Sequence, residues 1–239
     1  MASNSGKRLY YALFPAMLFV VALWLIALLQ WGLEKEWYNW GILPRTAEGI
    51  KGIFFSAFLH RDFMHLLANT PALLILGWFV YYFYKDIANE IMLFIWGGSG
   101  LLTWLIARPS YHIGASGMIY GIAFFLFFSG IFRKNTRLAA IALITVFIYG
   151  SLLWNMFPIA ELVDPSVSWE GHLSGALSGL ATAVLLRKKG PRPDPLPEDE
   201  AGDDSMETEA EDEVTSGQSD FIQQPSAHEA TTTEKSDSK

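Results

Sequence analysis

Six long apolar stretches limit the fold of this chain more than any other feature of its sequence. They cover Tyr10–Trp31, His65–Tyr84, Ile87–Ala107, Ser116–Phe132, Leu138–Phe157 and Trp169–Leu186. A helix crosses the hydrocarbon of a bilayer with about 20 residues, within a range of about 17–25, and all six stretches fall in that range. The sequence therefore predicts an all-α, polytopic membrane protein with a bundle of six transmembrane helices.

The composition agrees with a membrane protein and excludes several chemistries. Hydrophobic residues make up 51% of the chain and charged residues 17%, which is too apolar for a disordered chain or an ordinary soluble domain. The first stretch is too long for a signal peptide and lacks a small-residue cleavage site. The chain contains no cysteine, so disulfides, thiol catalysis and cysteine-ligated metals are excluded.

Charge divides the chain into two parts. Residues 1–190 carry 14 basic and 9 acidic residues, a net charge of +5, whereas residues 191–239 carry 3 basic and 15 acidic residues, a net charge of −12. The second part lacks the apolar surface that would offset the entropy of ordering. We therefore predict a membrane domain over 1–190 and a disordered acidic tail over 191–239, which either solvates the chain or recruits a partner.

Basic residues predict the orientation of the bundle. They gather before the first span and after the second, fourth and sixth spans: Lys7, Arg8, Lys85, Arg133, Lys134, Arg137, Arg187, Lys188, Lys189 and Arg192. The connections on the other side are poorer in lysine and arginine for their length. Under the positive-inside rule both termini lie in the cytoplasm, and because nothing resembles an organelle transit peptide we expect a bacterial plasma membrane.

The first outer connection, Gly32–Gly52, mixes aromatic and charged residues. It carries Trp37 and Trp40 and is followed by the apolar run Ile53–Leu59. This pattern suits either a segment lying in the outer membrane interface or an extracellular loop anchored by its aromatic residues.

Polar residues inside predicted spans are costly, and each is a candidate functional residue. The second span carries His65 and Asn69, which are four residues apart and share one helical face. His60 falls in the loop before that span, where it could brace the structure. The alternative role for the His65 and Asn69 pair is a hydrogen bond between helices.

The fourth span opens with a serine between glycines. Gly114 and Gly117 flank Ser116 and allow close backbone approach, an uncrowded hydroxyl and free N–H groups pointing toward it. These features suit a nucleophile beside an oxyanion site, and the alternative is an N-cap serine with packing glycines. Tyr120 lies four residues later on the same face, and His112 is expected to be an exposed loop residue.

The sixth span opens with a histidine above a stripe of small residues. Gly175 and Gly179 follow His172 at the spacing that lets another helix pack closely, so the alternative here is a packing motif with an incidental histidine. The functional interpretation is a base delivered to a neighbouring helix. Glu170 lies on roughly the opposite face and is a poor candidate for orienting His172.

These polar residues fall at one depth. An α-helix rises about 1.5 Å per residue, which gives the distance of each residue from the basic residue at the predicted cytoplasmic end of its span. This distance is about 24 Å for Asn69, about 26 Å for Ser116 and about 22 Å for His172. Polar residues that serve only as hydrogen bonds between helices are not required to lie at one depth. The common depth therefore favours a composite active site in the outer part of the membrane.

Serine and histidine together indicate acyl transfer. His172 would remove the proton of Ser116, and the developing oxyanion would meet donors from Asn69, His65 and the Ser116 backbone N–H, with Tyr120 packed against the imidazole. A zinc protease needs H-E-x-x-H, and the only His-Glu pair, His228-Glu229, falls in the tail. Since no paired carboxylates lie within the spans, an aspartyl protease is excluded as well.

Three motifs complete the pattern: H-x-x-x-N opens the second span, G-x-S-G-x-x-Y the fourth and G-H-x-x-G-x-x-x-G the sixth. In order, spacing and span they resemble the rhomboid intramembrane serine proteases, over roughly Trp31–Leu186. The chain departs from the family in its first outer loop, where many members carry a Trp-Arg pair. Here the loop has Trp37 and Trp40, with Arg45 later.

The resemblance implies a fold, an activity and a site. It implies a Ser116 nucleophile, a His172 base, an oxyanion hole from His65, Asn69 and the Ser116 amide, and a supporting set that comprises Tyr120, Gly114, Gly117, Gly175 and Gly179. It also implies cleavage of single-span membrane proteins within or beside their transmembrane segment. No cofactor, metal or nucleic acid is expected, and the pattern fixes no oligomeric state.

Two further functions compete with proteolysis. A rhomboid-like protein could bind transmembrane clients without cutting them, but such a protein needs neither Ser116 nor His172. A small transporter would place a charged residue near the membrane midplane and show an inverted repeat, and the sequence shows neither.

Overall fold

The computed structural model describes residues 2–35, 37–136, 138, 140, 141, 143, 156, 157 and 167–191. Within these ranges the regular structure is helical, without strands, and a single isolated bridge pairs Ile42 with His112. The predicted all-α fold class is thereby confirmed. The predicted fifth span, Leu138–Phe157, falls largely outside the described residues, and so does the acidic tail beyond Pro191.

Five long helices correspond to predicted spans. They are α1 (Ala2–Gly32), α3 (Phe63–Phe83), α4 (Ala88–Ile106), α5 (Ser116–Phe132) and α8 (Trp169–Leu185). By length and composition α1, α3 and α4 can cross a membrane, while α5 is apolar and shorter, at 17 residues. Only α1 extends well beyond its predicted bounds, toward the N-terminus.

Side-chain caps set where two of these helices begin. Asp62 precedes α3, and its Oδ1 accepts a hydrogen bond of 2.8 Å from the His65 backbone N–H. Ser168 precedes α8, and its Oγ accepts a hydrogen bond of 3.0 Å from the Gly171 N–H. Each cap satisfies a backbone donor that the first helical turn leaves unpaired. These caps fix the first turns, where His65 and His172 lie.

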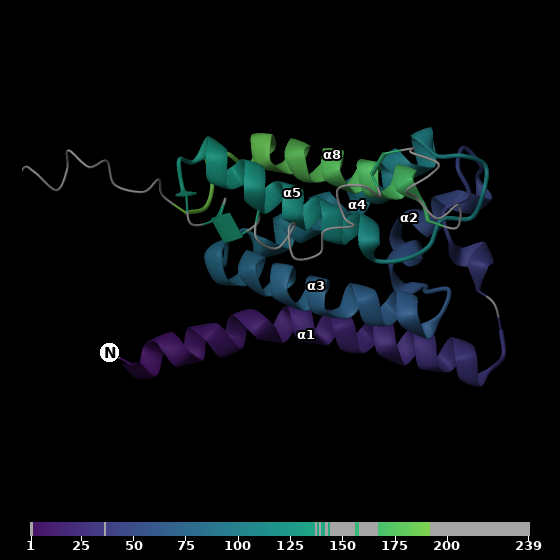
Figure 1. Ribbon diagram of the computed structural model, residues 1–239, viewed down its shortest axis with the longest axis horizontal. Coiled ribbons are helices and arrows are strands. Elements are labelled where there is room, and N and C mark those ends of the chain that lie inside the picture. The colour runs from purple at the N-terminus through teal and green to yellow at the C-terminus, as the bar shows by residue number, and fades with distance from the viewer. Residues whose placement is uncertain are drawn as a thin grey trace, which may run out of the picture. The chain divides into compact units, whose positions relative to one another are not determined.

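The helices pack around α5. This helix contacts α8, α4 and α3, and α1 lies along the far side of α3 (Figure 1). The contact surfaces are filled by fully buried side chains such as Leu23, Leu73, Ile95, Ile122 and Phe125. Helix α5, which begins at Ser116, and helix α8, whose first turn carries His172, are therefore direct neighbours. Their N-terminal ends lie at the same end of the bundle.

Glycines bring α5 and α8 into backbone contact. A Cβ at Gly175 would collide with the carbonyl of Gly117, and a Cβ at Gly179 would collide with the carbonyl of Gly121. Because the two glycines on each helix lie four residues apart, they form matching stripes on the facing sides of α5 and α8. The sixth predicted span thus packs on the fourth through Gly175 and Gly179.

The connection between α1 and α3 folds into short helical turns. It contains η1 (Tyr38–Trp40), η2 (Glu48–Ile50), α2 (Gly52–Phe55) and η3 (Ser56–Phe58), and α2 packs against α4. Arg45 anchors this segment, because its Nη1 donates to the carbonyls of Leu105 (3.1 Å) and Ala107 (2.8 Å) at the end of α4. A cation is favourable at a helix C-terminus.

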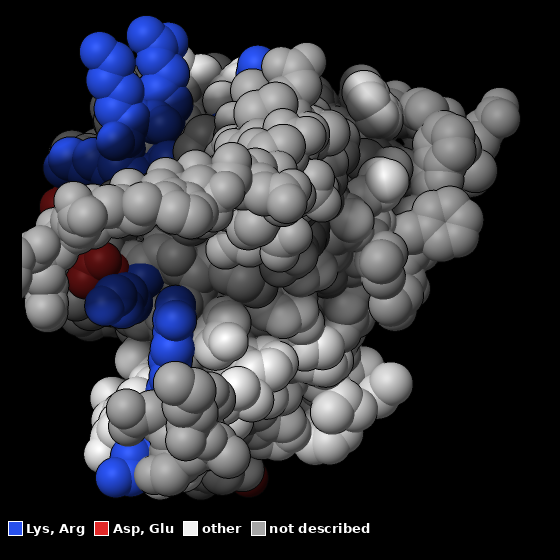
Figure 2. Space-filling view, turned by 90° about the vertical axis from the view of Figure 1, so that its left-hand side faces the viewer, with Lys and Arg blue, Asp and Glu red and all other residues white. Residues whose placement is uncertain are grey.

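Lysine and arginine residues gather at the opposite end of the bundle (Figure 2). There Arg133 is buried beyond the end of α5, and its guanidinium donates to Ser129 Oγ (2.9 Å) and to the carbonyls of Leu186 (2.6 Å) and Lys189. Arg133 therefore joins the ends of α5 and α8. The two helices that contact through glycine at one end are held by a cation at the other.

Candidate active site

Ser116 and His172 meet where α5 and α8 begin. The Ser116 Oγ lies 3.0 Å from His172 Nε2, within hydrogen-bond distance. The N-cap of α5 is Ala115, and no side-chain cap is present, so Ser116 is the first residue of the helix and its hydroxyl does not serve as a cap. The structure thus brings together the two residues that the sequence singled out, in the geometry of a nucleophile and a base.

Tyr120 holds the imidazole of His172 from one face. The two rings stack with centroids 4.2 Å apart and an angle of 13° between their planes. Tyr120 lies one turn after Ser116 on α5, so the helix that presents the hydroxyl also restrains the ring that faces it. Both Tyr120 and His172 are buried, whereas Ser116 is half-buried.

His65 lies against the turn that leads into Ser116. Gly114 has a φ of +113°, a conformation that favours glycine. A Cβ at Gly114 would fall 2.8 Å from His65 Cε1 and 3.9 Å from Ser116 Oγ. At Gly117 the constraint is the space available, since a Cβ there would lie 2.6 Å from Ser99 Oγ and 3.2 Å from the Gly171 carbonyl. The flanking glycines are therefore needed for the close approach of His65, Ser116 and α8.

Asn69 lies one turn beyond His65 on α3 and is buried. Its amide Nδ2 donates a hydrogen bond of 3.1 Å to His60 Nε2, which leaves the imidazole of His60 as the acceptor. The His60 and His65 rings meet edge to face, with centroids 5.1 Å apart. His60, expected in the preceding loop as a brace, is fully buried there and holds Asn69 in place.

Burial makes His60 a neutral histidine in the folded protein. Removal of the ring from water, followed by the nearby charge of His65, lowers the pKa of His60 from 6.5 to about 3. This residue precedes the capped start of α3 and lies outside the predicted span. The hydrogen bond from the Asn69 amide requires an unprotonated Nε2, so geometry and burial agree on the neutral form.

Acidification is expected to destabilise the protein through His60. Because the folded pKa is about 3 and the unfolded value is about 6.5, the unfolded state binds more protons between these values, and stability falls as the pH falls through this window. At pH 5 the loss from this residue is about 2 kcal/mol. Thermal midpoints of the purified chain at pH 7 and pH 5 measure it, and His60→Gln should show a smaller difference. An equal pH dependence in both proteins would contradict the prediction.

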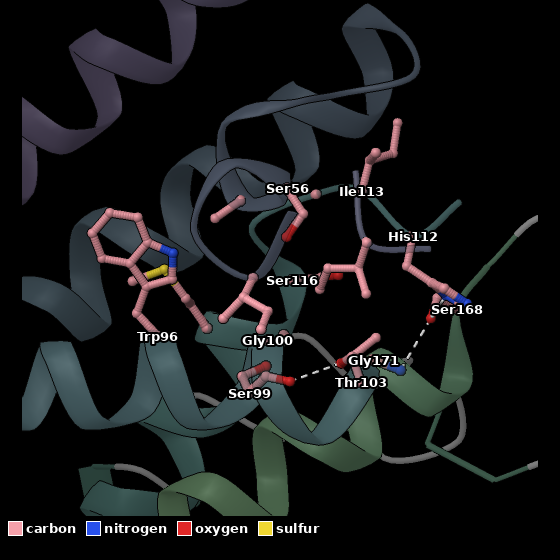
Figure 3. Close-up of a pocket in the computed structure, with 16 residues that line it drawn as sticks. Ser56, Trp96, Ser99, Gly100, Thr103, His112, Ile113, Ser116, Ser168 and Gly171 are labelled. Carbon is pink, nitrogen blue, oxygen red and sulfur yellow. Dashed lines mark hydrogen bonds between the residues drawn. The ribbon is translucent and has the colours of Figure 1, made fainter. Parts of the chain in front are cut away.

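A cavity of about 610 Å³ opens beside the Ser116 and His172 pair. Its lining combines the pair with His65 of α3 and with charged and aromatic residues of the connecting segments, among them Arg61, Asp62, Tyr38, Arg108 and Tyr111. Asn69, one turn further along α3, is not among the lining residues. A narrower hollow of about 40 Å³ extends behind Ser116 toward the hydroxyl groups of Ser56, Ser99 and Thr103 (Figure 3). That space suffices for an ordered water molecule.

The structure corrects the expectation for His112. We expected an exposed loop residue, but His112 is only 5% exposed. Its Nδ1 lies 2.6 Å from the hydroxyl of Ser168, and its backbone pairs with Ile42. The segments that carry His112, Ser168 and Ile42 have no long periodic pattern, so their contacts could not be predicted from the sequence.

Glu170 takes no direct part in the pair of Ser116 and His172. Its carboxylate lies 3.6 Å from Arg108 Nε and accepts a hydrogen bond of 3.4 Å from the Arg108 backbone N–H. Within the described part of the chain, no cluster of histidine and carboxylate residues could hold a metal ion.

Comparison with known families gives a match over most of the helical region. The profile of the Rhomboid domain matches residues 47–189, which is more than half of the chain and includes Ser116, His172, Tyr120, His65 and Asn69. The matched region starts within the connection between α1 and α3 and ends after α8.

Individual relatives are bacterial and viral. An uncharacterized protein of Mycobacterium tuberculosis (strain ATCC 25618 / H37Rv) is 38% identical over 158 residues, 61% of this chain and 63% of that protein. One of Mycobacterium leprae is 36% identical over 177 residues, 70% of this chain and 68% of the relative. A protein of Acanthamoeba polyphaga mimivirus, named as rhomboid protein L523, is 26% identical over 59% of this chain and 78% of its own length. The match thus spans less than two thirds of the M. tuberculosis relative.

Proposed function

The chain belongs to the rhomboid family of integral membrane proteins, and on this basis we propose that it is an intramembrane serine endopeptidase. The observation that carries the proposal is the 3.0 Å contact between Ser116 Oγ and His172 Nε2, beside a cavity and beneath the stacked ring of Tyr120. The proposed substrates are single-span membrane proteins, cut within or next to their transmembrane segment. No cofactor takes part in the proposed reaction.

The proposed reaction is acyl transfer through a Ser–His dyad. His172 Nε2 takes the proton of Ser116 as Oγ attacks the scissile carbonyl carbon, and the protonated imidazole then gives that proton to the leaving amine. Water, activated by the same imidazole, hydrolyses the acyl-enzyme ester and regenerates the Ser116 hydroxyl. Stacking on Tyr120 supports this role, because it keeps the ring aimed at one partner through both proton transfers.

The developing oxyanion requires donors that are already in place. We assign this role to the Ser116 backbone N–H, at the free N-terminus of α5, together with His65 and the Asn69 amide. The contact of His65 with the Gly114 turn supports its assignment. An amide carries two N–H donors, so Asn69 can hold His60 with one and act toward the site with the other.

Removing the Asn69 amide should slow catalysis without weakening substrate binding. For Asn69→Ala we expect kcat to fall about 100-fold with KM changed less than about threefold, because an oxyanion donor acts in the transition state. Steady-state cleavage of a transmembrane reporter measures both constants. Thr70→Ser, a smaller change at the next position of α3 that keeps the hydroxyl group, is the control. A rise in KM at constant kcat would place Asn69 in substrate binding instead.

The proposal includes an orientation and a domain assignment. The end of the bundle that is rich in lysine and arginine would face the cytoplasm of a bacterium, which places the Ser116 and His172 pair toward the outer leaflet. Activity would reside in residues 1–190, followed by the acidic tail 191–239.

The test is cleavage of a membrane reporter by the purified full chain in detergent. The reporter carries one transmembrane segment with small, helix-destabilising residues, and a poly-leucine segment of equal length serves as its control. Cleavage of the first reporter and not of the second is the expected result. Failure of the chain to cut any of a broad panel of such reporters would favour a rhomboid-like protein that binds transmembrane clients.

A further inference from the structure

His112 connects the two segments that lead into the Ser116 and His172 pair. It lies in the loop before α5, four residues ahead of Ser116, and Ser168 lies four residues ahead of His172. The bond between His112 Nδ1 and Ser168 Oγ is 2.6 Å long, and the contact between Ser116 Oγ and His172 Nε2 is 3.0 Å long. The same two segments are thus joined twice, at positions four residues apart on each.

The partners of His112 define the direction of its hydrogen bonds. The Arg108 carbonyl, 3.0 Å from His112 Nε2, can only accept, so Nε2 carries the proton. Nδ1 then has a free lone pair and accepts the hydroxyl hydrogen of Ser168. The Ser168 oxygen in turn accepts the Gly171 N–H, as the labelled side chains show (Figure 3). A neutral imidazole thereby orients the hydroxyl group that caps α8.

Ser168 controls the helical turn on which His172 stands. Its Oγ caps the Gly171 N–H at 3.0 Å, and its carbonyl accepts the His172 N–H at 3.2 Å. His112 is fixed on the other side by two backbone hydrogen bonds with Ile42, of 2.9 and 3.0 Å. The connection between α1 and α3 therefore holds His112, His112 holds Ser168, and Ser168 holds the turn that presents the imidazole.

We propose that His112 is a positioning residue for catalysis, which sets the distance between Ser116 and His172 through its hydrogen bond to Ser168. This inference rests on the proposed protease function and adds to it a residue outside the dyad and the oxyanion hole. Displacement of a reacting group by about 1 Å can cost about 100-fold in rate, so a bond that fixes the first turn of α8 has a large effect on the chemical step.

Burial, more than the charged groups nearby, favours the neutral form of His112. The Arg108 side chain lies on its own loop, and Glu170, from the first turn of α8, engages Arg108. Burial lowers the pKa of His112, while the backbone hydrogen bond to Arg108 and the charge of Glu170 oppose that shift. A neutral ring is the form that can accept the Ser168 hydroxyl hydrogen.

The test compares variants that differ in one hydrogen bond. His112→Phe keeps a planar ring without an acceptor, and His112→Asn places an amide oxygen near the position of Nδ1. Ser168→Ala removes the hydroxyl and Ser168→Thr keeps it. Ser178→Ala, which removes a hydroxyl from a deeper turn of α8, is the matched control. The full chain is assayed with the transmembrane reporter, and thermal midpoints are recorded for each protein.

His112→Phe is expected to lower kcat about 10- to 100-fold with KM changed less than about twofold, and His112→Asn to recover most of the loss. Because both residues act through one bond, the double variant His112→Phe with Ser168→Ala should be no slower than the slower single variant. Unchanged kcat in His112→Phe, multiplicative losses in the double variant, or failure of His112→Asn to rescue would each overturn the proposal.

A second measurement separates this inference from the proposed function. The nitrogen chemical shifts of ¹⁵N-labelled histidine report the hydrogen bond of His172 Nε2 to Ser116, without any substrate. His112→Phe should move the His172 signal toward its value in Ser116→Ala, and the signal of the wild-type protein should be restored in His112→Asn. An unmoved His172 signal in His112→Phe would refute the positioning role. Absence of reporter cleavage by the wild-type chain would instead refute only the protease function.

Discussion

Replacement of Ser116 by alanine is expected to lower kcat/KM for a cleavable transmembrane reporter by at least about 10⁴-fold, because the change removes the hydroxyl that lies 3.0 Å from His172 Nε2. His172→Ala should cause a loss of similar size. Since the two residues act as one unit, the double variant should be no worse than either single variant. Initial cleavage rates at substrate concentrations well below KM measure all three.

The control for this prediction is a serine in the same pair of helices. Ser178 lies on α8 and donates to the backbone carbonyls of Phe94 and Ile95, two turns from His172. Ser178→Ala should retain activity, and Ser116→Ala should keep the thermal midpoint of the unmodified protein. Residual activity above about one tenth in Ser116→Ala would show that another group is the nucleophile.

Gly175→Val is expected to prevent the stable packing of α8 on α5. A Cβ at this position would collide with the backbone carbonyl of Gly117, and backbone in a helix cannot move aside as a flexible side chain does. Overpacking of a close contact costs about 1–3 kcal/mol, and a branched side chain against backbone lies at the upper end or beyond. We expect a thermal midpoint lowered by many degrees and loss of cleavage, both measured on the purified chain.

Gly97→Ala provides the matched control for helix glycines. A Cβ there would meet only the ring of Phe54, at 4.0 Å, which is an ordinary contact. Since alanine favours helix more than glycine does, this variant should be as stable as the wild-type protein or slightly more stable. Equal midpoints for Gly175→Val and Gly97→Ala would show that α5 and α8 do not depend on close backbone approach.

The sequence predicted the helices well because a transmembrane helix is specified locally. A long apolar run has one low-energy conformation in a bilayer, so α4 and α5 begin and end within one residue of their predicted bounds. The pairing of Ser116 with His172 was predictable for a related reason. Both lie near the start of predicted spans, so residues at one predicted depth can meet, and the glycine stripe of α8 indicated a close neighbour.

The loops were less predictable, because their contacts depend on tertiary structure. Residues 37–58 form short turns without a long period, and nothing local indicates that Ile42 pairs with His112. The burial of His112 was therefore missed. A signal did exist: His112 precedes Ser116 by the same number of residues as Ser168 precedes His172. Because α5 and α8 run side by side from one end, equal offsets place the second pair close together.

Covalent trapping of Ser116 tests whether its hydroxyl is activated by His172. The purified full chain is treated with a fluorophosphonate, which reacts with a serine hydroxyl activated by a base, and the modified peptide is identified by mass spectrometry. We expect a single adduct on Ser116 that forms in the wild-type protein and is lost in His172→Ala. An unmodified Ser116 in the wild-type protein, or labelling at an unchanged rate in His172→Ala, would contradict the existence of an activated dyad.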